Sequence, residues 1–449
     1  MTGPSIVSAE RVVPGWRAGT TPVEGPDEDA FTLAVAALER LADRAGTDPL
    51  PSHLELVGEL PGDADALLGE ALGDAALDVR HHAATAEGLG RALVAAAGPG
   101  SPERDPGHRA VVVVDVAAGR PERAAAAVGL LVAPGDGARI DGYASRSHPA
   151  DRPPDAARWV DAAGRAQPGL GGDGPRRAVL LAAAAPPVLL AEVERAFPGV
   201  RTMVAPWIEP GTAGRHPATR AASVLVDAAA DGRPGERVVV AAVDRERTDL
   251  LGLTVGETPL VPGGTAAAER GRPTPDGRPF DSPVLGDGPR SEGAYVARAR
   301  YLENLPARWR FVGERCGACG ATTFPPAGRC RACGRADALG PRALPRRGLV
   351  VDAATTVGRG AQPTEFDGLV ERIGAYAVVL AGWPGEGVRV TLQVADAEPG
   401  SVRIGDAVAT QLRRLYPLEG AWRYGRKAVL LPPDGADVSR APSAGSTGP

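Results

Sequence analysis

The stretch RCGACGATTFPPAGRCRACG, residues 315–334, contains every cysteine of this 449-residue chain. It holds two CxxCG loops, with Cys316 and Cys319 in the first and Cys330 and Cys333 in the second, and ten residues lie between Cys319 and Cys330. The two-residue gap in each loop lets both thiolates point at one ion, and the glycine that follows can adopt the left-handed conformation such a turn needs. Four thiolates complete a tetrahedral shell, so the motif predicts one structural zinc ion per chain.

The ten-residue gap between the loops is shorter than the usual four-cysteine spacing, which favours a compact ribbon. A disulfide framework is the alternative. We expect free thiolates instead, because paired CxxC cysteines in a large chain that starts without a secretory signal are typical of a cytosolic protein.

The composition narrows the classes of protein that this chain can belong to. Hydrophobic residues make up 43% of it, enough for real cores, and the length suggests roughly two to four domains. The net charge of −5 argues against a general nucleic-acid-binding protein. No run of about 18 apolar residues occurs, so we expect no membrane span and a cytoplasmic location. Lys427 is the only lysine, which we attribute to genomic base bias rather than to function.

Residues 26–256 alternate between helical and strand patterns. The acidic run Pro26–Asp29 predicts a helix start, because carboxylates are favoured at the positive end of the helix dipole. The consecutive valines Val111–Val114 indicate a strand that is covered on both faces. The predicted elements are a helix after residue 29, a strand at 54–58, a helix at 83–97, a strand at 109–116, and a hairpin of 130–133 with 138–143 around the turn 134–137.

The same order of elements recurs further along the chain. Helix 217–230 leads into strand 237–243, much as helix 83–97 leads into strand 109–116. A strand at 178–184 and a helix at 188–197 precede the second pair. Two copies of a β/α unit predict a duplicated, layered α/β fold.

The last third of the chain has a different pattern. A helix at 294–305 precedes the cysteines, and its apolar side is predicted to carry Tyr295, Tyr301, Leu302 and Leu305. Five apolar strands follow the cysteines, which predicts a small OB-type barrel. The strands are expected at 348–357, 374–382, 387–395, 405–412 and 426–431. The predicted organisation is an α/β domain at 1–258, a linker at 259–290, a helix plus zinc ribbon at 291–342, the barrel at 343–433 and a disordered tail at 434–449.

Residues 294–432 resemble the acyl-CoA-associated zinc-ribbon/OB-fold family, long classed as a domain of unknown function. The resemblance rests on the cysteine stretch and on three further segments, RGLVVDAATTV (347–357), VRIGDAV (402–408) and RYGRKAVLLPP (423–433). It implies a rubredoxin-like ribbon followed by an OB barrel. It also implies a protein that binds or hands over acyl-CoA and holds a thiolase-fold partner enzyme.

Residues 26–256 resemble the thiolase superfamily, closest to hydroxymethylglutaryl-CoA synthases and β-ketoacyl synthase III-like proteins. This resemblance rests on PDEDAFTLAVAALERLADRAGTDP (26–49), RAVVVVDVAAGRPE (109–122) and GTAGRHPATRAASVLVDAA (211–229). It implies a contact through the edge of the central sheet, either with a second copy or with an active thiolase homologue.

The chain departs from the thiolase pattern where the chemistry should be. The resemblance places the nucleophilic cysteine at the start of the helix in HHAATAEGLGRALVAAA (81–97), where the helix dipole would lower its pKa, and this chain has Ala86 there. No cysteine occurs in residues 1–315, and the base histidine is missing from LLAAAAPPVLL (180–190). Glu59 falls near the family's acid position but cannot become acylated in place of a cysteine. These departures favour a degenerate thiolase-like domain.

Other polar residues have plainer interpretations. His81 and His82 could be catalytic, but a pair that faces solvent at a loop or helix start is the favoured prediction. His216 could lie near the former active-site cleft or at a helix cap, and the sequence does not decide between these. Thr85 could replace the nucleophile, but no base is identifiable beside it. An aromatic and cationic set could contact the adenine and phosphates of CoA or simply fill the barrel core, and the sequence does not decide between these: Trp309, Arg310, Phe311, Trp422 and Tyr424.

The sequence thus predicts a non-catalytic, zinc-stabilised scaffold protein that binds acyl-CoA and assists a thiolase or condensing enzyme. The first alternative is an active acyltransferase of the hydroxymethylglutaryl-CoA synthase or thiolase type with an unrecognised nucleophile. The second is a nucleic-acid-binding ribbon/OB protein, which the acidic charge and the lack of a basic stripe with interleaved aromatics disfavour.

Overall fold

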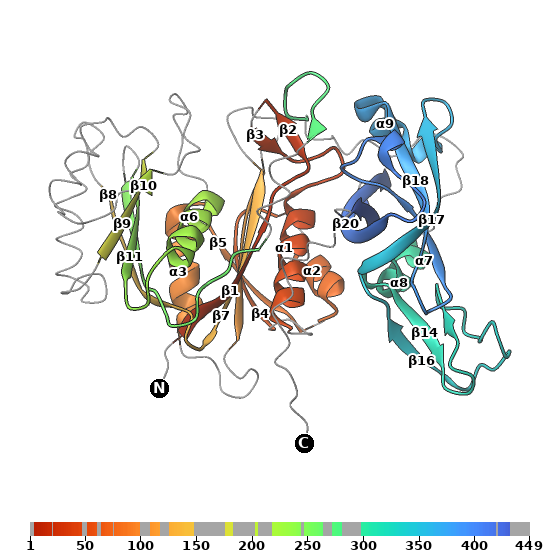
Figure 1. Cartoon of the computed structure of the whole chain (residues 1–449), viewed down its shortest axis with the longest axis horizontal. Coiled ribbons are helices and arrows are strands. Elements are labelled where there is room, and N and C mark those ends of the chain that lie inside the picture. Colours follow the sequence, from red (N-terminus) through yellow and green to blue (C-terminus); the bar gives the residue numbers. More distant parts are fainter. Residues whose placement is uncertain are drawn as a thin grey trace. The chain divides into compact units, whose positions relative to one another are not determined.

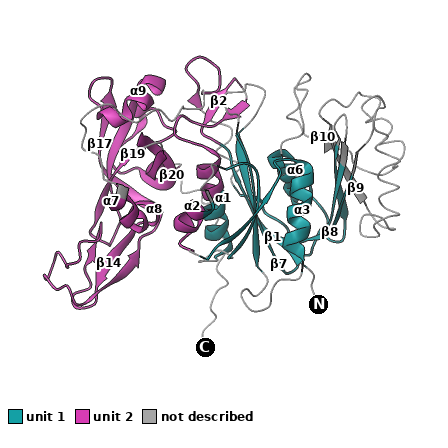
Figure 2. Ribbon diagram, turned by 180° about the vertical axis from the view of Figure 1, so that it is seen from behind, with its two compact units in different colours: residues 1–13, 37–65, 76–268 teal, residues 14–36, 66–75, 269–449 magenta. Residues whose placement is uncertain are grey.

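The computed structural model describes residues 4–19, 21–46, 52–60, 64–74, 76–98, 108–116, 125–147, 176–182, 203–204, 218–243, 247–263, 272–280, 298–418 and 421–431. The chain divides into two compact units, which Figure 2 colours separately. Unit 1 comprises residues 1–13, 37–65 and 76–268, and unit 2 comprises residues 14–36, 66–75 and 269–449. Among the described residues, no helix is long and apolar enough to cross a membrane.

A ten-stranded sheet forms the framework of unit 1. In spatial order its strands are β10 (Met203–Val204), β9 (Arg176–Ala182), β11 (Arg237–Val243), β12 (Arg247–Thr254), β8 (Ala138–Ser147), β1 (Pro4–Val12), β7 (Ala126–Pro134), β6 (Arg109–Asp115), β4 (His53–Val57) and β5 (Asp78–His82). From each outer edge inward, three parallel strands are followed by two antiparallel ones, and the two halves meet where β1 pairs with β8. The predicted duplication is therefore present in the strand order.

Two helices hold equivalent places in the two halves. Helix α3 (Ala86–Ala97) precedes β6, and helix α6 (Ala218–Ala230) precedes β11; they lie side by side (Figure 1) and contact each other. Each helix packs on strands from both halves of the sheet, and their apolar side chains form one buried core with those strands. On β6, Val111–Val114 are at most 1% exposed, which confirms a strand covered on both faces.

The predicted hairpin is wrong in its pairing, although both strands exist. Strand β1, which the sequence analysis did not predict, lies between β7 and β8 and pairs antiparallel with each. The turn at 134–137 therefore carries the chain across the end of β1 instead of reversing it. Gly137 makes this possible, because a Cβ atom there would lie 2.2 Å from the carbonyl oxygen of Ile6.

Two further helices come from the first part of the chain, α1 (Ala30–Ala45) and α2 (Ala64–Leu72). The predicted start of α1 is confirmed at Asp29. Its carboxylate accepts a hydrogen bond from the Thr32 amide at 2.9 Å, and its own amide donates to the Thr32 hydroxyl at 2.9 Å. This reciprocal pair is a capping box.

Part of the predicted linker is ordered within unit 2. Strand β13 (Arg272–Pro273) pairs parallel with β2 (Trp16–Ala18), which in turn pairs with β3 (Thr21–Val23). The ring of Phe280 lies edge-on to that of Trp16, with centroids 5.1 Å apart. Residues 264–271 and 281–297 of this region lie outside the described residues.

The predicted helix at 294–305 is two short helices instead, α7 (Arg298–Glu303) and α8 (Leu305–Arg310). Asn304 separates them, and Pro306 lies in the first turn of α8, where a missing amide hydrogen breaks no helical bond. Tyr301 and Leu305 are buried as predicted, whereas Leu302 is 48% exposed and Tyr295 lies outside the described residues. The ribbon follows as a three-stranded sheet of β14 (Val312–Cys316), β15 (Thr322–Thr323) and β16 (Leu339–Ala343).

Five strands complete unit 2 and confirm the predicted barrel strands. Their order is β19 (Arg389–Gln393), β18 (Ala375–Gly382), β17 (Arg347–Gly358), β20 (Ala407–Leu418) and β21 (Ala421–Leu430). A parallel bridge between Val394 and Ala428 brings the two edges together, so the sheet closes. Short helices fill two connections: η2 (Thr364–Phe366) and α9 (Asp367–Ile373) after β17, and η3 (Pro399–Ser401) after β19.

The predicted fold class is confirmed: a duplicated layered α/β unit, a four-cysteine ribbon and a closed β-barrel. The predicted helix at 188–197, His216 and the predicted tail at 434–449 lie outside the described residues.

Candidate functional site

The four cysteines lie in two loops of the ribbon that have the same backbone geometry. In each, the amide after the second cysteine donates to the carbonyl of the first: Gly320 to Cys316 at 2.8 Å and Gly334 to Cys330 at 2.9 Å. Gly320 and Gly334 have φ angles of 75° and 78°, so the predicted left-handed glycines are confirmed. The CxxCG spacing thus fixes the local shape of both loops.

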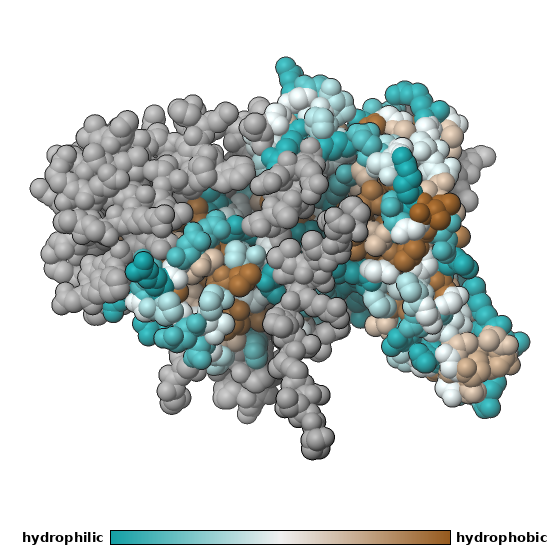
Figure 3. Space-filling model, in the orientation of Figure 1, coloured by the Kyte–Doolittle hydropathy of each residue, from teal (hydrophilic) through white to brown (hydrophobic). Residues whose placement is uncertain are grey.

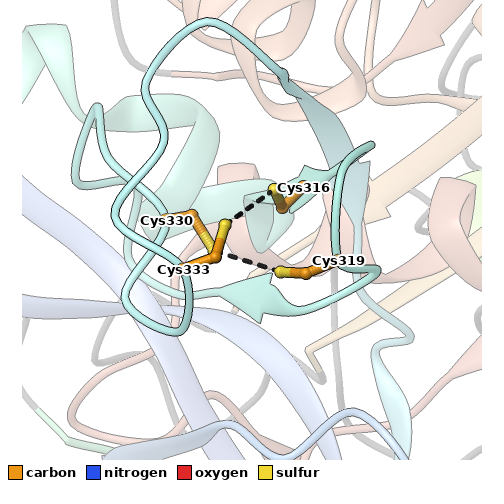
Figure 4. Close-up of side chains that lie close together, drawn as sticks. All are labelled: Cys316, Cys319, Cys330 and Cys333. Atoms are coloured by element: carbon orange, nitrogen blue, oxygen red, sulfur yellow. Dashed lines mark hydrogen bonds between the residues drawn. The ribbon is translucent and has the colours of Figure 1, made fainter.

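The sulfur atoms come together at one point between these loops (Figure 4), and all four lie within 4.8 Å of one another. The Sγ atoms of Cys316 and Cys333 are 3.7 Å apart, and those of Cys319 and Cys330 are 3.6 Å apart. Four sulfurs at about 2.3 Å from a central zinc would be about 3.8 Å from each other in a regular tetrahedron. The donor set and its spacing therefore fit one tetrahedral ion, and they leave no fifth position for a substrate.

The backbone around the site favours thiolates at two of the four positions. Amide groups of Cys333 and Ala332 hydrogen-bond to the Cys330 sulfur and lower its pKa to about 6. Amides of Cys319 and Ala318 likewise lower the pKa of Cys316. At Cys319 an amide also acts to lower the pKa, but the adjacent sulfurs outweigh it and raise the pKa to about 12. A bound cation removes that conflict, because it stabilises all four thiolates together.

The cysteine loops form the exposed end of the ribbon, and the opposite end is fixed to the barrel. In Figure 3 the exposed end is pale to tan, as expected from surface residues such as Ala318, Cys319 and Ala332. Toward the barrel, Glu386 accepts hydrogen bonds from the Thr322 hydroxyl at 2.6 Å and from the Arg342 guanidinium at 2.5 Å. The metal loops are thus carried on a ribbon that the barrel holds in place.

Aromatic rings make the second link between ribbon and barrel. Phe311, Phe324 and Trp383 lie in edge-on pairs with centroids 5.2 to 5.7 Å apart. The Trp383 indole donates a hydrogen bond to the carbonyl of Pro345 at 2.8 Å. Folding of the ribbon and of this side of the barrel core should therefore depend on each other.

Ala86, at the nucleophile position of the thiolase resemblance, is the first residue of α3. Thr85 is the N-cap, and its hydroxyl accepts a hydrogen bond from the Gly88 amide at 3.2 Å. Gly88 lies so close to the preceding turn that a Cβ there would be 1.9 Å from the carbonyl oxygen of Ala83. Glu59 is exposed. The helix start is well formed, but the side chain at its first position has no reactive atom.

The two adjacent histidines end strand β5, which the sequence analysis did not predict. The exposed His81 lies 2.8 Å from Asp65. His82 is only 16% exposed, and its Nε2 lies 2.6 Å from the buried carboxylate of Glu55 on the neighbouring strand. The prediction that both face solvent is therefore wrong for His82, because β5 turns alternate side chains toward and away from the core.

Of the five residues proposed to contact CoA or to fill the core, three are buried. Trp309 is 1% exposed, Phe311 2% and Tyr424 3%. The Trp309 indole donates to the carbonyl of Tyr424 at 3.0 Å. Arg310 and Trp422 keep part of their side chains at the surface, and the guanidinium of Arg414 lies 4.8 Å from the Trp422 ring centroid. Contact of any of the five with CoA stays a prediction.

A cluster of buried charges in unit 2 was missed by sequence reasoning. The only lysine, Lys427 on β21, is 1% exposed, and its Nζ lies 2.8 Å from Asp27. Arg413 on β20 is ion-paired with Glu28, also 1% exposed, and lies 2.6 Å from Asp396. The single lysine in an arginine-rich chain was a signal of this cluster in the sequence. The sequence analysis attributed that lysine to base composition and so did not predict the cluster.

Comparisons with known proteins agree with the ribbon geometry. The family model described as "ChsH2, rubredoxin-like zinc ribbon domain" matches residues 305–339. A protein of Methanothermobacter thermautotrophicus named "DUF35 domain-containing scaffold protein" is 28% identical over 130 residues, which cover 28% of this chain and 92% of that protein. These matches confirm the resemblance to a rubredoxin-like zinc ribbon and support a metal site at the four cysteines.

Solved structures of Xanthomonas campestris OleA are similar to this chain in fold. The cerulenin-bound form has a TM-score of 0.43 at 12% identity and covers 56% of this chain and 98% of that one. The form with bound lauric acid and lauroyl-CoA has a TM-score of 0.43 at 12% identity and covers 56% of this chain and 99% of that one.

Proposed function

We propose that this chain is a non-catalytic scaffold protein of acyl-CoA metabolism, with one structural zinc ion in its ribbon. It binds acyl-CoA and assists an active thiolase or condensing enzyme. The observation that carries the proposal is the contrast between two sites. All four cysteines of the chain surround one point in the ribbon, while the helix start that would present a thioester nucleophile carries Ala86.

The chemistry of each site supports this assignment. A four-thiolate site has no open coordination position, so its ion can stabilise the ribbon but cannot activate a water or a carbonyl. Acyl transfer through a covalent intermediate requires a nucleophile and a base within hydrogen-bonding reach, and an alanine methyl group supplies neither. A chain with these two properties can bind and position other molecules, which is what a scaffold does.

The protein of Methanothermobacter thermautotrophicus is named a scaffold protein, which supports the scaffold part of the proposal. The match covers 92% of that protein over 130 residues, about the length of a ribbon plus barrel. For the partner we propose an active thiolase-fold enzyme or a second copy of this chain. The candidate contact is strand β5, which forms one edge of the ten-stranded sheet in the described residues and can pair with a strand of another chain.

A native pull-down tests the proposal. The tagged chain is purified from its own cells at low salt, and the bound proteins are identified by mass spectrometry. We expect a thiolase-fold enzyme to be retained by the wild-type chain. A variant with Val79→Pro on β5 should lose it, because proline removes a backbone donor from the edge. Recovery of the chain alone, as a strict monomer at micromolar concentration, would contradict the partner assignment.

Acyl-CoA binding is tested separately by calorimetry with acetyl-CoA. Trp422→Ala and Arg310→Ala change the two candidate contacts that remain partly exposed, and each should weaken binding if it contacts CoA. Leu302→Ala, at an exposed position outside the candidate set, is the control. Absence of heat at millimolar acetyl-CoA would remove acyl-CoA from the proposed function and leave the scaffold role.

A further inference from the structure

Three consecutive acidic residues, Asp27, Glu28 and Asp29, each meet their own partner on strands β20 and β21. Asp27 pairs with Lys427 at 2.8 Å, and Glu28 pairs with Arg413. Asp29 uses both carboxylate oxygens: one caps α1, and the other accepts a hydrogen bond from the Tyr424 hydroxyl at 2.9 Å.

The backbone of this acidic segment is bound as well. The amide of Arg414 donates to the carbonyl of Asp27 at 2.8 Å, and the Arg414 guanidinium donates to the carbonyl of Glu28. These contacts join residues that are 386 or more positions apart in the sequence. They fix the direction and register of the segment on β20, which side-chain pairs alone would not do.

An aromatic side chain in the first turn of α1 anchors the segment. Phe31 is 0% exposed, and its ring centroid lies 4.9 Å from that of Tyr424 and 6.0 Å from that of Trp309. Buried aromatic anchors beside desolvated charge pairs are typical of the centre of a binding interface. The segment therefore presents a short pattern, Asp-Glu-Asp-x-Phe. Lys427, Arg413 and the Tyr424 hydroxyl contact the three acids in turn, and the rings of Tyr424 and Trp309 contact the phenylalanine.

We infer that strands β20 and β21, with Trp309, form a recognition site for an acidic helix start of the pattern Asp-Glu-Asp-x-Phe. In this chain residues 27–31 occupy it. Buried ion pairs add little to stability compared with apolar residues of the same size, but they penalise any occupant with the wrong charges. A contact that served packing alone would not need a polar partner for each of three consecutive acidic residues. The inference goes beyond the proposed scaffold function and does not depend on a partner enzyme.

The experiment uses the full chain with a specific protease site inserted within residues 264–271. After cleavage, the two fragments are analysed by size exclusion at moderate salt. We expect the wild-type fragments to elute together, because residues 27–31 and the barrel now lie on different fragments. Other contacts, such as the pairing of β13 with β2, contribute to this association, so variants and not the wild type alone decide the question.

The variants change charge with little change in size. Glu28→Gln and Asp27→Asn should each weaken association of the fragments by about 30-fold or more, as for loss of one member of a buried charge pair. Glu59→Gln is the matched control, an exposed acid on the same fragment. Exchanging the charges in the double variant Asp27→Lys with Lys427→Asp should recover much of the loss.

A second measurement keeps the test informative if a cleaved variant is unstable. A labelled peptide of residues 24–38 is added to the uncut triple variant Asp27→Asn, Glu28→Gln, Asp29→Asn, whose zinc content and circular dichroism report folding. The peptide should bind this variant, whose own segment has lost its charges, and not the wild type, whose own segment occupies the site. A peptide with Asn, Gln and Asn in place of Asp27, Glu28 and Asp29 should bind neither protein. Unchanged association in the cleaved single variants, or equal binding of both peptides, would overturn the inference.

Discussion

Replacing Lys427 with methionine should destabilise unit 2, because it leaves the carboxylate of Asp27 buried without its nearest cation. The two side chains are 1% and 9% exposed and 2.8 Å apart. Methionine is close to lysine in volume and lacks the charge, so the change removes the ion pair without opening a large cavity. The effect of the substitution therefore measures mainly the unpaired buried charge.

The size of the effect follows from burial and from the remaining cations. Removing one partner of a buried ion pair costs about 3–5 kcal/mol. Burial alone would raise the pKa of Asp27, but Lys427 and Arg413 outweigh it and the pKa lies below its usual value. Because Arg413 remains in the variant, we expect a loss of unfolding free energy at the lower end of this range, about 3 kcal/mol. For a unit of about 200 residues this corresponds to a loss of about 6–12 °C in Tm.

Urea unfolding followed by the tryptophan fluorescence of unit 2, with calorimetry alongside, measures this loss. The double variant Asp27→Leu with Lys427→Met removes both charges and should return to within about 1.5 kcal/mol of the wild type. Arg389→Gln is the control, because it breaks an exposed pair with Asp352 and should change stability by less than about 0.5 kcal/mol. A single-variant loss below about 1 kcal/mol, or a double variant as unstable as the single one, would refute the reasoning.

Three further outcomes are expected. Stability of unit 2 should fall as the pH drops below about 4, since the folded pKa of Asp27 lies below its unfolded value of about 3.9, and the double variant lacking this pair should lose less. Elemental analysis should give one zinc per chain, and Cys319→Ala should lose both the zinc and the hydrogen-exchange protection of the ribbon while unit 1 keeps its own; a disulfide found by mass spectrometry would contradict this. Incubation with acetyl-CoA and acetoacetyl-CoA should give no covalent adduct in intact-mass spectra, and Ala86→Cys alone should not produce turnover, whereas an adduct mapped to residues 26–256 would reject the non-catalytic assignment.

The features that the sequence predicted are those coded by short spacings. The shape of each CxxCG loop is set by hydrogen bonds and a glycine within the loop itself. The ribbon and the left-handed Gly320 and Gly334 could therefore be predicted from a few residues. The run Val111–Val114 likewise predicted a strand covered on both faces. Five barrel strands and the repeated order of helix and strand followed from the same local patterns.

The features that were missed depend on residues far apart in the sequence. Strand β1 lies between β7 and β8 because of pairing across more than 100 positions, and a four-residue turn looks the same whether the strands beside it pair or not. The charge cluster is a stronger case. Asp27 and Glu28 read as a helix start, and nothing near them in the sequence indicates that their partners are Lys427 and Arg413.

The shape of helix α3 has a structural explanation that does not depend on catalysis. Gly88 passes the carbonyl of Ala83, and Gly90 faces Tyr143 so closely that a Cβ would lie 2.0 Å from its ring. Tyr143, on β8, in turn donates a hydrogen bond at 2.8 Å to Asp249 on the adjacent strand β12, in the same half of the sheet. These contacts hold the two halves around the helix and need no reactive side chain at Ala86. The start of helix α3 therefore has a structural role that needs no reactive side chain, and its geometry alone is no evidence for an active acyltransferase.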